Sequence, residues 1–570
     1  MKIVRLRVKN FRTIGSGYNG EGVNLDLGDH NLIFLIGKNN TGKSALLEAY
    51  DMFVKAERTA SQADFHNKDT QNQIEIEAWI QAETEEDKKH KSVSAWLDSD
   101  AVARIRKRWE AIGAQGIKES WDPNATEWKT GGAGGFDTIL QNGCPTPVWI
   151  RGMASPEDVI TALQTLVKST ILKNIKETVA YKNAQAAIEN LQGEVEKHEY
   201  ATRIESNINN IITKIFPEVS FRVTSEGEQD FSKLLSSQTG IHICEKDRPE
   251  LTMEYHGHGI RRQFILSAYR GLSDKFELIA KRGKKKEEEF TIQEIKDKAE
   301  SKTHMLLYEE PELFLHPDPM RVVKDLIYNL AEDSEFQIIA ATQSPIMIDL
   351  SRSHTTLVRV TSTPSMGTML SQVTQDLFSD DDREHMKMLN KFDPHVCEAF
   401  FADRIVLVEG DTEAVTARTL MSRLREEAKV EPSDFVQVVN CASKMYIPFF
   451  QKVLRHFFIP YFVLHDLDSR QLSSGKANPA WSVNGSIWEE LSKAIKAGIS
   501  CRRFVFVPNF ERAHGYDFNP AFGKPFTAFQ QAVSWDLEDK SKPFVVFLLH
   551  ILGIHEVKED FSPEELEKLA

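Results

Sequence analysis

Residues 31–44 read NLIFLIGKNNTGKS, a short apolar run followed at once by a glycine-containing loop. The apolar half, 31–36, has the continuous hydrophobicity of a central strand that is buried on both faces. The loop, 37–44, matches the pattern G-x-x-x-x-G-K-S/T, and residues 45–52 continue with a helical pattern. Because a phosphate-binding loop needs this strand–loop–helix context, the stretch predicts a P-loop nucleotide site in an α/β fold.

The residue types in this loop indicate what it would bind. Glycines let backbone N–H groups surround phosphate oxygens, and the lysine would reach the terminal phosphates. The serine hydroxyl is the expected Mg²⁺ ligand, and the expected nucleotide is ATP. The predicted nucleotide-binding residues of the loop are Gly37, Asn39, Asn40, Thr41, Gly42, Lys43 and Ser44.

A second, acidic segment supplies the other half of an ATPase. Residues 305–308 form an apolar strand pattern that runs directly into Glu309 and Glu310. Glu309 would complete the Mg²⁺ shell, and Glu310 would orient or deprotonate the attacking water. The long separation from the P-loop predicts a large insertion, and residues 156–216, where helix-breaking residues are scarce, fit a helical arm.

This layout resembles the ABC-type ATPase heads of chromosome-maintenance and recombinational-repair proteins. The resemblance implies ATP hydrolysis across a dimer, with a glycine-rich signature of one subunit covering the nucleotide of the other. Residues 256–263 resemble that signature, so Gly257 and Gly259 are expected to face the γ-phosphate. Gln343 stands where such heads have a switch histidine. Because glutamine can donate a hydrogen bond but cannot carry a proton, we expect ATP to act more as a bound switch than as fuel.

Carboxylates follow two strands of a predicted second sheet. Beyond residue 400, four strand patterns alternate with helical ones, which predicts a small parallel sheet. Glu409 follows the strand at 404–408, with Glu413 one helical turn further on, and Asp466 and Asp468 follow the strand that starts at 461. Such a cluster is suited to Mg²⁺ or Mn²⁺ and would be costly without a cation. The sequence therefore predicts a metal site.

The E-G-x-x-E and D-x-D patterns of these acids resemble the Toprim domain of topoisomerases, primases and related nucleases. An ABC-type head followed by a Toprim domain resembles the OLD (overcoming lysogenization defect) family of ATP-dependent endonucleases, which includes the Gabija nuclease subunit. The resemblance covers roughly residues 1–80 and 250–530. It implies that Glu511 completes a second metal site, that Lys524 neutralises charge on the phosphorane, and that Glu409 is the base or a shared ligand in a two-metal mechanism.

The family resemblance implies a DNA endonuclease that acts in defence against phages under nucleotide control. It also implies a DNA substrate and a homodimer or homotetramer formed through the head and the arm. A defence-system partner, either a helicase or a retron RNA–DNA product, stays open. Two other functions stay open as well: a repair-type ATPase clamp on DNA with a structural C-terminal domain, and an ATP-sensing switch that regulates a partner.

Composition sets further bounds on these functions. The chain carries 70 Lys plus Arg against 84 Asp plus Glu, a net charge of −14, which is unfavourable for a broad basic DNA-binding face. However, at least four acids beyond residue 400 are predicted metal ligands, so the acidic total does not exclude a nucleic-acid substrate. No apolar run of about 20 residues occurs and no signal segment precedes the first strand, so we expect a cytoplasmic protein without a membrane partner.

The expected fold class is α/β, an ABC/SMC-type P-loop head with an inserted helical arm, followed by a C-terminal Toprim domain. The expected segments are the N-terminal part of the head with the P-loop (1–155), a helical dimerisation arm (156–235), the C-terminal part of the head with the signature and the second acidic segment (236–375), a Toprim nuclease domain (400–545), and a tail helix (546–570).

Overall fold

The structure is a computed structural model, and it forms two compact units. One unit contains Met1–Ile348 and Arg352–Leu370, and the other contains Asp349–Ser351 and Ser371–Ala570. The residues that it describes are 1–28, 30–55, 57–89, 93–152, 199–225, 239–245, 251–252, 255–264, 266–267, 304–332, 336–349, 352, 355–372, 394–402, 404–427, 429, 436–472 and 474–569.

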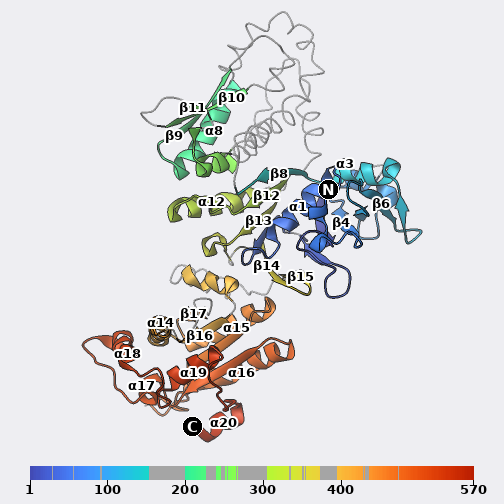
Figure 1. The fold of residues 1–570 in the computed structure, drawn as a ribbon. Coiled ribbons are helices and arrows are strands. Elements are labelled where there is room, and N and C mark those ends of the chain that lie inside the picture. Colours follow the sequence, from blue (N-terminus) through green and yellow to red (C-terminus); the bar gives the residue numbers. More distant parts are fainter. Residues whose placement is uncertain are drawn as a thin grey trace, which may run out of the picture. The chain divides into compact units, whose positions relative to one another are not determined.

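A six-stranded sheet in the order β15-β14-β3-β13-β12-β8 organises the first unit (Figure 1). Its strands are β3 (Leu32–Ile36), β8 (Thr146–Ile150), β12 (His304–Glu309), β13 (Phe336–Thr342), β14 (Thr355–Thr363) and β15 (Gly367–Gln372). Every residue of β3 is buried, and β13 and β14 both run parallel to it. Because β12 is parallel to β13 and β8, the carboxyl ends of four adjacent strands meet at one edge, where ligands bind in α/β sheets.

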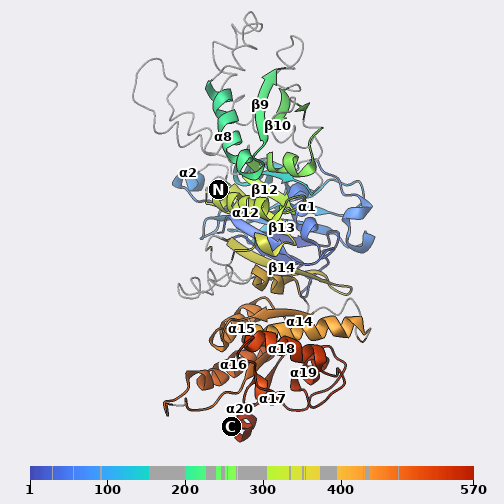
Figure 2. The same ribbon diagram turned by 90° about the vertical axis from the view of Figure 1, so that its left-hand side faces the viewer.

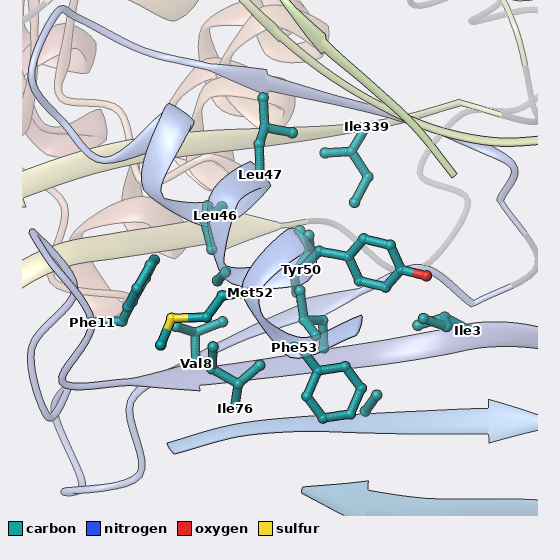
Figure 3. Close-up of a cluster of buried hydrophobic side chains, with 14 of the residues drawn as sticks. Ile3, Val8, Phe11, Leu46, Leu47, Tyr50, Met52, Phe53, Ile76 and Ile339 are labelled. Atoms are coloured by element: carbon teal, nitrogen blue, oxygen red, sulfur yellow. The ribbon is translucent and has the colours of Figure 1, made fainter. Parts of the chain in front are cut away.

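Helix α1 (Lys43–Val54) fixes the P-loop against this sheet. Gly42 precedes it with a φ of 106°, and the helix contains neither glycine nor proline. Figure 3 shows its apolar side chains between Ile339 of β13 and Val8 and Ile76 of a second, antiparallel sheet. Burying each large apolar side chain contributes roughly 1.5–3 kcal/mol, so contacts on both sides hold the start of α1 in place.

The second sheet of this unit is antiparallel, in the order β2-β1-β4-β5-β6-β7. Its strands are β1 (Lys2–Lys9), β2 (Val23–Asp26), β4 (Ile74–Gln81), β5 (Val102–Trp109), β6 (Ile117–Asp122) and β7 (Glu127–Thr130). In β5, buried Ala103, Ile105 and Trp109 alternate with partly exposed arginines, which is the pattern of a sheet with one face on the core.

Further elements complete the first unit. The helices are α2 (Glu85–Lys89), α3 (Asp137–Gly143), α8 (Glu199–Ile215) and α12 (Pro317–Ala331). The short helical turns are η1 (Gln62–Asp64), η2 (His66–Lys68), η3 (Ser94–Trp96), η4 (Gly132–Phe136) and η8 (Pro345–Met347). A small antiparallel sheet has the order β11-β10-β9, with β9 (Val219–Ser225), β10 (Thr239–Glu245) and β11 (Leu251–Thr252).

The predicted arm needs a correction at its C-terminal end. Most of it, residues 156–198 and 226–235, lies outside the described residues. Helix α8 is the described part, but it ends at Ile215, just before Pro217, and Val219–Ser225 then pairs as β9 with β10. Proline cannot continue a helix, and the segment after it alternates in the manner of a strand, so the helical segment does not extend to 235.

The second unit has a four-stranded sheet in the order β17-β16-β18-β19, with all neighbours parallel. The strands are β16 (Arg404–Val408), β17 (Val436–Asn440), β18 (Tyr461–Asp466) and β19 (Cys501–Phe506). The helices are α14 (Asp411–Glu426), α15 (Ile447–His456), α16 (Pro479–Lys496), α17 (Phe510–Ala513), α18 (Gly523–Ser534), α19 (Pro543–Ile551) and α20 (Pro563–Leu569), with turns η9 (Pro394–Phe401) and η10 (Lys444–Tyr446). Helix α14 packs against α18 and α19 (Figure 2).

The C-terminal segment also differs from the prediction. Instead of one tail helix over 546–570, it forms α19, which begins at Pro543, and the separate helix α20. Phe544, Phe561 and Leu566 from this segment belong to the core of the second unit. Within the described ranges, no helix has a stretch long and apolar enough to cross a bilayer.

Candidate functional site

The P-loop glycines are required by close contacts. A Cβ atom at position 37 would lie 2.2 Å from the backbone oxygen of Val360. At position 42 it would lie 2.1 Å from Oγ1 of Thr368, on a backbone with a φ of 106°. The Thr368 hydroxyl donates a hydrogen bond to the carbonyl of Thr41 at 2.8 Å. The loop is therefore held from β15, and larger residues would displace it.

Lys43 is the buried cation of this loop. Its Nζ donates to the carbonyls of Gly37 at 2.7 Å and Lys38 at 2.6 Å. Burial lowers the pKa of Lys43, while the nearby Glu310 and Glu312 carboxylates oppose that shift. The ammonium group is thus placed at the loop with few water contacts, as a phosphate ligand should be.

A cavity of about 370 Å³ opens beside Lys43. Its lining residues come from the P-loop, β8, β12 and β13, and they are Lys43, Ser44, Arg151, Gly152, Glu309, Glu310, Leu313 and Ala341. The structure thus brings together four of the residues predicted from sequence. Asn39 and Asn40 are exposed in the same loop, whereas Gln343, Gly257 and Gly259 do not line this cavity.

The paired acids after β12 have separate partners. Glu309 Oε2 accepts a hydrogen bond from the backbone N–H of Gly152 at 3.2 Å. Glu310 has a φ of 46°, an uncommon backbone conformation for a residue with a side chain, and its Oε1 accepts from Nε2 of Gln343. Glu312 accepts from the Gln343 N–H at 2.8 Å and from the Thr342 hydroxyl at 2.9 Å. Burial raises the pKa of Glu312.

The segment that resembles the signature packs behind the acids. Residues 258–264 are helical, and the buried Arg262 donates to the carbonyls of Glu309 and of Glu310, the latter at 2.7 Å. Tyr308 donates to Oε1 of Gln263 at 3.1 Å. A Cβ atom on Gly259 would come within 2.9 Å of the Phe314 carbonyl, while one on Gly257 would meet nothing within 4 Å. Arg262 and Gln263 therefore support the acidic segment of their own chain.

The predicted metal ligands lie along the carboxyl edge of the second unit's sheet. Glu409 follows β16, Asp466 ends β18, and Asp468 lies two residues further on. Glu511 belongs to α17, directly after β19, and Glu413 lies in the first turn of α14. Glu409 Oε1 accepts from the N–H of Asp466 at 2.7 Å, and Glu413 Oε2 accepts from the N–H of Gly410 at 3.2 Å.

The electrostatics of this cluster call for a cation. Burial, reinforced by the Glu409, Glu413, Asp468 and Glu511 carboxylates, raises the pKa of Asp466 to about 9. Burial is also the main cause that raises the pKa of Glu409 to about 7 and that of Glu413 to about 8. Asp466 Oδ1 is buried without a hydrogen-bond partner. A cluster of partly and fully buried carboxyl groups, with one oxygen lacking a hydrogen-bond partner, fits a hard divalent cation such as Mg²⁺ or Mn²⁺.

The carboxylates do not yet form a closed ligand shell. In the part of the chain that the structure describes, no three His, Cys, Asp or Glu side chains converge into a metal-binding group. Instead, Nζ of the buried Lys444 lies 2.7 Å from Oδ2 of Asp468 and 4.0 Å from Oε1 of Glu409. Lys524 Nζ contacts Glu511 Oε1 at 2.8 Å, and this hydrogen bond raises the pKa of Lys524. A cation would therefore have to draw the acids together.

Three side chains at these sites were not among the predicted site residues. Arg151 lines the nucleotide cavity, Lys444 contacts the metal-site acids, and the buried Tyr516 hydroxyl has no hydrogen-bond partner. Burial is the main cause that raises the pKa of Tyr516, and the carboxylates of Glu511, Glu413 and Asp466 add to the shift. The Tyr516 hydroxyl therefore lies near the same acids. The position of Lys444 after a predicted strand was a usable signal for its place near the acids. Arg151 had no such signal, because nothing in the sequence shows that β8 lies next to β12.

Family models match both units. Residues 1–111 and 156–348 match the model of the AAA ATPase domain. Residues 400–468 match the model of the Overcoming lysogenization defect protein-like TOPRIM domain. These two matches confirm the predicted ATPase domain followed by a C-terminal Toprim domain, and the resemblance to the OLD family.

Three relatives carry nuclease names. The chain is 30% identical over 250 residues to the OLD nuclease of Thermus scotoductus, covering 42% of this chain and 46% of that protein. It is 22% identical over 416 residues to the Old nuclease of Escherichia phage P2, covering 68% and 66% respectively. It is 23% identical over 459 residues to Endonuclease GajA of Bacillus cereus, covering 78% and 72%. The chain thus spans less than half of the first relative's length and just under two thirds of the second's.

A solved structure of an Smc head bound to the C-winged helix domain of ScpA matches with a TM-score of 0.40 and 14% identity, covering 66% of this chain and 98% of that one. That likeness carries no argument about the family of this chain. Because the ATPase model instead accounts for more than half of the 570 residues, the chain belongs to the AAA ATPase domain family, and an OLD-like TOPRIM domain follows the ATPase domain in the same chain.

Proposed function

We propose that this protein is an ATP-controlled DNA endonuclease of the OLD type that needs Mg²⁺ or Mn²⁺. The observation that carries the proposal is the gathering of Glu409, Glu413, Asp466 and Asp468 at one sheet edge, in the segment that the TOPRIM model matches. Such a concentration of buried negative charge costs stability unless a cation is bound there. A purely structural domain would not need it.

In the proposed nuclease site, each residue has a distinct role. Glu409, Glu413, Asp466, Asp468 and Glu511 would hold two divalent cations, which supply Lewis acidity and favour hydroxide at neutral pH. Glu409 would either bridge the two cations as a shared ligand or accept a proton from the attacking water; in the metal-free protein, burial raises its pKa to about 7. Lys524, which is half exposed, swings from Glu511 to the scissile phosphate and neutralises its developing charge.

In the proposed ATPase site, Lys43 binds the terminal phosphates and Ser44 and Glu309 would hold Mg²⁺. Glu310 orients the attacking water, and Gln343 holds Glu310 through a hydrogen bond between their side chains. Since glutamine cannot relay a proton, we propose slow turnover, so that bound ATP sets the state of the nuclease. The glycines Gly257 and Gly259 would act on the nucleotide of a second copy.

The proposal extends to the setting in which the protein works. We propose a homodimer or homotetramer formed through the ATPase head and the arm, acting in the cytoplasm on DNA of invading phages. A helicase or a retron RNA–DNA product is the proposed type of controlling partner. This part of the proposal rests on the family resemblance alone.

A cleavage assay on the full-length chain tests the proposal. Supercoiled plasmid and linear DNA are incubated with Mg²⁺ or Mn²⁺, with and without ATP. We expect cleavage by the wild type, none by Glu409→Ala, and wild-type cleavage by Glu489→Ala, which removes an exposed acid of the same unit. We expect Lys43→Ala to abolish any difference that ATP makes.

Three outcomes would count against this function. Cleavage that survives Glu409→Ala would remove the assigned nuclease site. An ATP response that survives Lys43→Ala would remove the assigned nucleotide control. DNA binding that depends on ATP but never leads to cleavage would favour the repair-type clamp.

A further inference from the structure

Arg151 lines the nucleotide cavity and directly follows β8. The sequence alone did not assign the β8 segment to the nucleotide site. Strand β8 ends at Ile150, which pairs with Tyr308 of the parallel strand β12. Arg151 therefore leaves the sheet beside Glu309, and both line the same cavity as Lys43 and Ser44. Because Arg151 directly follows Ile150, the sheet fixes the point at which this residue starts.

The order of the strands places Arg151 opposite Lys43. Along β3-β13-β12-β8, the residues that follow the strands are the P-loop with Lys43, then Gln343, then the acids Glu309 and Glu310, and last Arg151. Neighbouring strands are about 4.8 Å apart, so three spacings separate the outer strands by roughly 14 Å. The cationic side chains Lys43 and Arg151 thus follow the two outer strands. Glu309, the proposed Mg²⁺ ligand, and Glu310, the proposed water-orienting acid, lie between them. A terminal phosphate bound near those acids has Lys43 on one side and Arg151 on the other.

A neighbouring indole holds the guanidinium in place. Trp149 belongs to β8, and Arg151 is the first residue after that strand. Cζ of Arg151 lies 4.3 Å from the centre of the Trp149 ring, within cation–π distance. Trp149 Nε1 donates to Oδ1 of Asp51 at 2.9 Å, and Asp51 belongs to α1, the helix that the P-loop opens. Arg151 is therefore tied to the phosphate-binding helix through Trp149.

The guanidinium also has donors available for a ligand. Among the residues that the structure describes, no carboxylate forms an ion pair with Arg151. An arginine presents five N–H donors in a planar fork, which suits two phosphate oxygens better than the point charge of a lysine.

We propose that Arg151 binds the γ-phosphate and thereby lets this site distinguish ATP from ADP, with Trp149 as its positioning residue. The inference rests on the proposed ATP-binding function and specifies how the site recognises the triphosphate. Lys43 would reach the terminal phosphates of either nucleotide, whereas the γ-phosphate that Arg151 would bind is present only in ATP. Loss of that group on hydrolysis would remove the proposed ligand of Arg151, whose neighbour Gly152 donates a hydrogen bond to Glu309.

Binding of two nucleotides to the full-length chain tests this inference. Dissociation constants for AMP-PNP and for ADP are measured by titration calorimetry in Mg²⁺, for the wild type, Arg151→Ala and Arg151→Lys. We expect the wild type to prefer AMP-PNP. Arg151→Ala should weaken AMP-PNP binding about tenfold or more and ADP binding by less than about twofold, the size typical for one charged hydrogen-bonding group. Arg151→Lys should fall between them.

Two further variants separate this role from a structural one. Arg321→Ala removes an exposed arginine of the same unit, outside the cavity, and should leave both constants unchanged. Trp149→Phe keeps a ring but removes the hydrogen bond to Asp51, and it should weaken AMP-PNP selectively by a smaller factor.

The outcomes are distinguishable. If Arg151→Ala and Arg151→Lys weaken AMP-PNP and ADP equally, or weaken neither, the γ-phosphate role is refuted while the proposed function stands. If the wild type binds neither nucleotide, the proposed ATP site fails, and this inference fails with it. A selective loss of AMP-PNP in both variants, at unchanged melting temperature, supports the inference.

Discussion

Asp466 shows how a single residue can serve a site at the expense of stability. Its folded-state pKa of about 9 lies above the ordinary value of 3.8, so this carboxyl favours folding when protonated and opposes it increasingly as pH rises between those values. At neutral pH the charged form is therefore unfavourable in the metal-free protein. The penalty comes from burial and from four neighbouring acids, and it is relieved if a cation binds.

We expect Asp466→Asn to raise the melting temperature of the second unit in chelator by at least about 2 °C, the shift that roughly 1 kcal/mol gives in a domain of this size. We also expect Mg²⁺ or Mn²⁺ to raise the melting temperature of the wild type but not of this variant, because only the wild type keeps the ligand. Calorimetry with and without metal measures both effects. Glu489→Gln, an exposed acid of the same unit, is the control for charge loss. A destabilised Asp466→Asn, or one that keeps the metal effect, contradicts this account.

For single site residues, the sequence predicted which residues follow the strand ends better than it predicted which side chains they contact. Lys43, Ser44, Glu309 and Glu310 line one cavity because strand–loop junctions can be located from local patterns alone. Arg151 could not be identified in that way, since its place depends on which strands are neighbours. Lys444 followed a recognisable strand, but its contact with Asp468 depends on the fold of the turn η10.

Among the elements, β19 secures the C-terminal segment through a buried arginine. Arg503 is 1% exposed, and its Nε donates to the Phe561 carbonyl at 2.7 Å while Nη1 donates to the Asn484 carbonyl at 2.8 Å. Its Cζ lies 4.6 Å from the centre of the Trp488 ring of α16. One side chain thus ties β19 to α16 and to the segment that leads into α20.

We expect Arg503→Met to lower the free energy of unfolding of the second unit by about 2–4 kcal/mol, because methionine keeps most of the volume but leaves two buried carbonyls without donors. Urea denaturation followed by circular dichroism measures the loss. Arg418→Met, on the exposed side of α14, should change stability by less than about 0.5 kcal/mol. Equal stability of the two variants would mean that Arg503 does not anchor the segment.

The elements themselves were predictable where their patterns are local. The strand expected at 404–408 is β16 with the same limits, and the helix after the P-loop exceeds the expected 45–52 by two residues at each end. The antiparallel pairing of β4 to β7 was not predicted, because it depends on contacts between distant segments. The helical pattern expected to end at residue 216 matches the end of α8, but the arm segment drawn to 235 includes β9, because Pro217 ends the helix and an alternating segment follows it.

For the whole molecule, the division into two units has a consequence for function. Every buried residue in the main core of the second unit lies between Val406 and Leu566, and the partly buried residues packed on it come from the same range. The metal ligands and Lys524 of the proposed nuclease site belong to this unit as well, whereas the P-loop, the acids Glu309 and Glu310, and Arg151 belong to the first. The second unit therefore contains all the side chains of the proposed nuclease site, whereas the proposed ATPase site is completed by Gly257 and Gly259 of a second copy.

We expect a fragment of residues 394–570 to unfold in one cooperative transition, because its core and its sheet need no residue from the first unit. In the proposed function, this fragment should cleave DNA with Mg²⁺ or Mn²⁺, lose cleavage on Glu409→Ala, and show no response to ATP. Calorimetry and the plasmid assay measure these properties, with the full-length chain alongside. If the fragment folds and binds metal but cleaves nothing while the full chain cleaves, the first unit must contribute to the nuclease site. ATP would then do more than control it, because the ATPase unit itself would help to form the reactive centre.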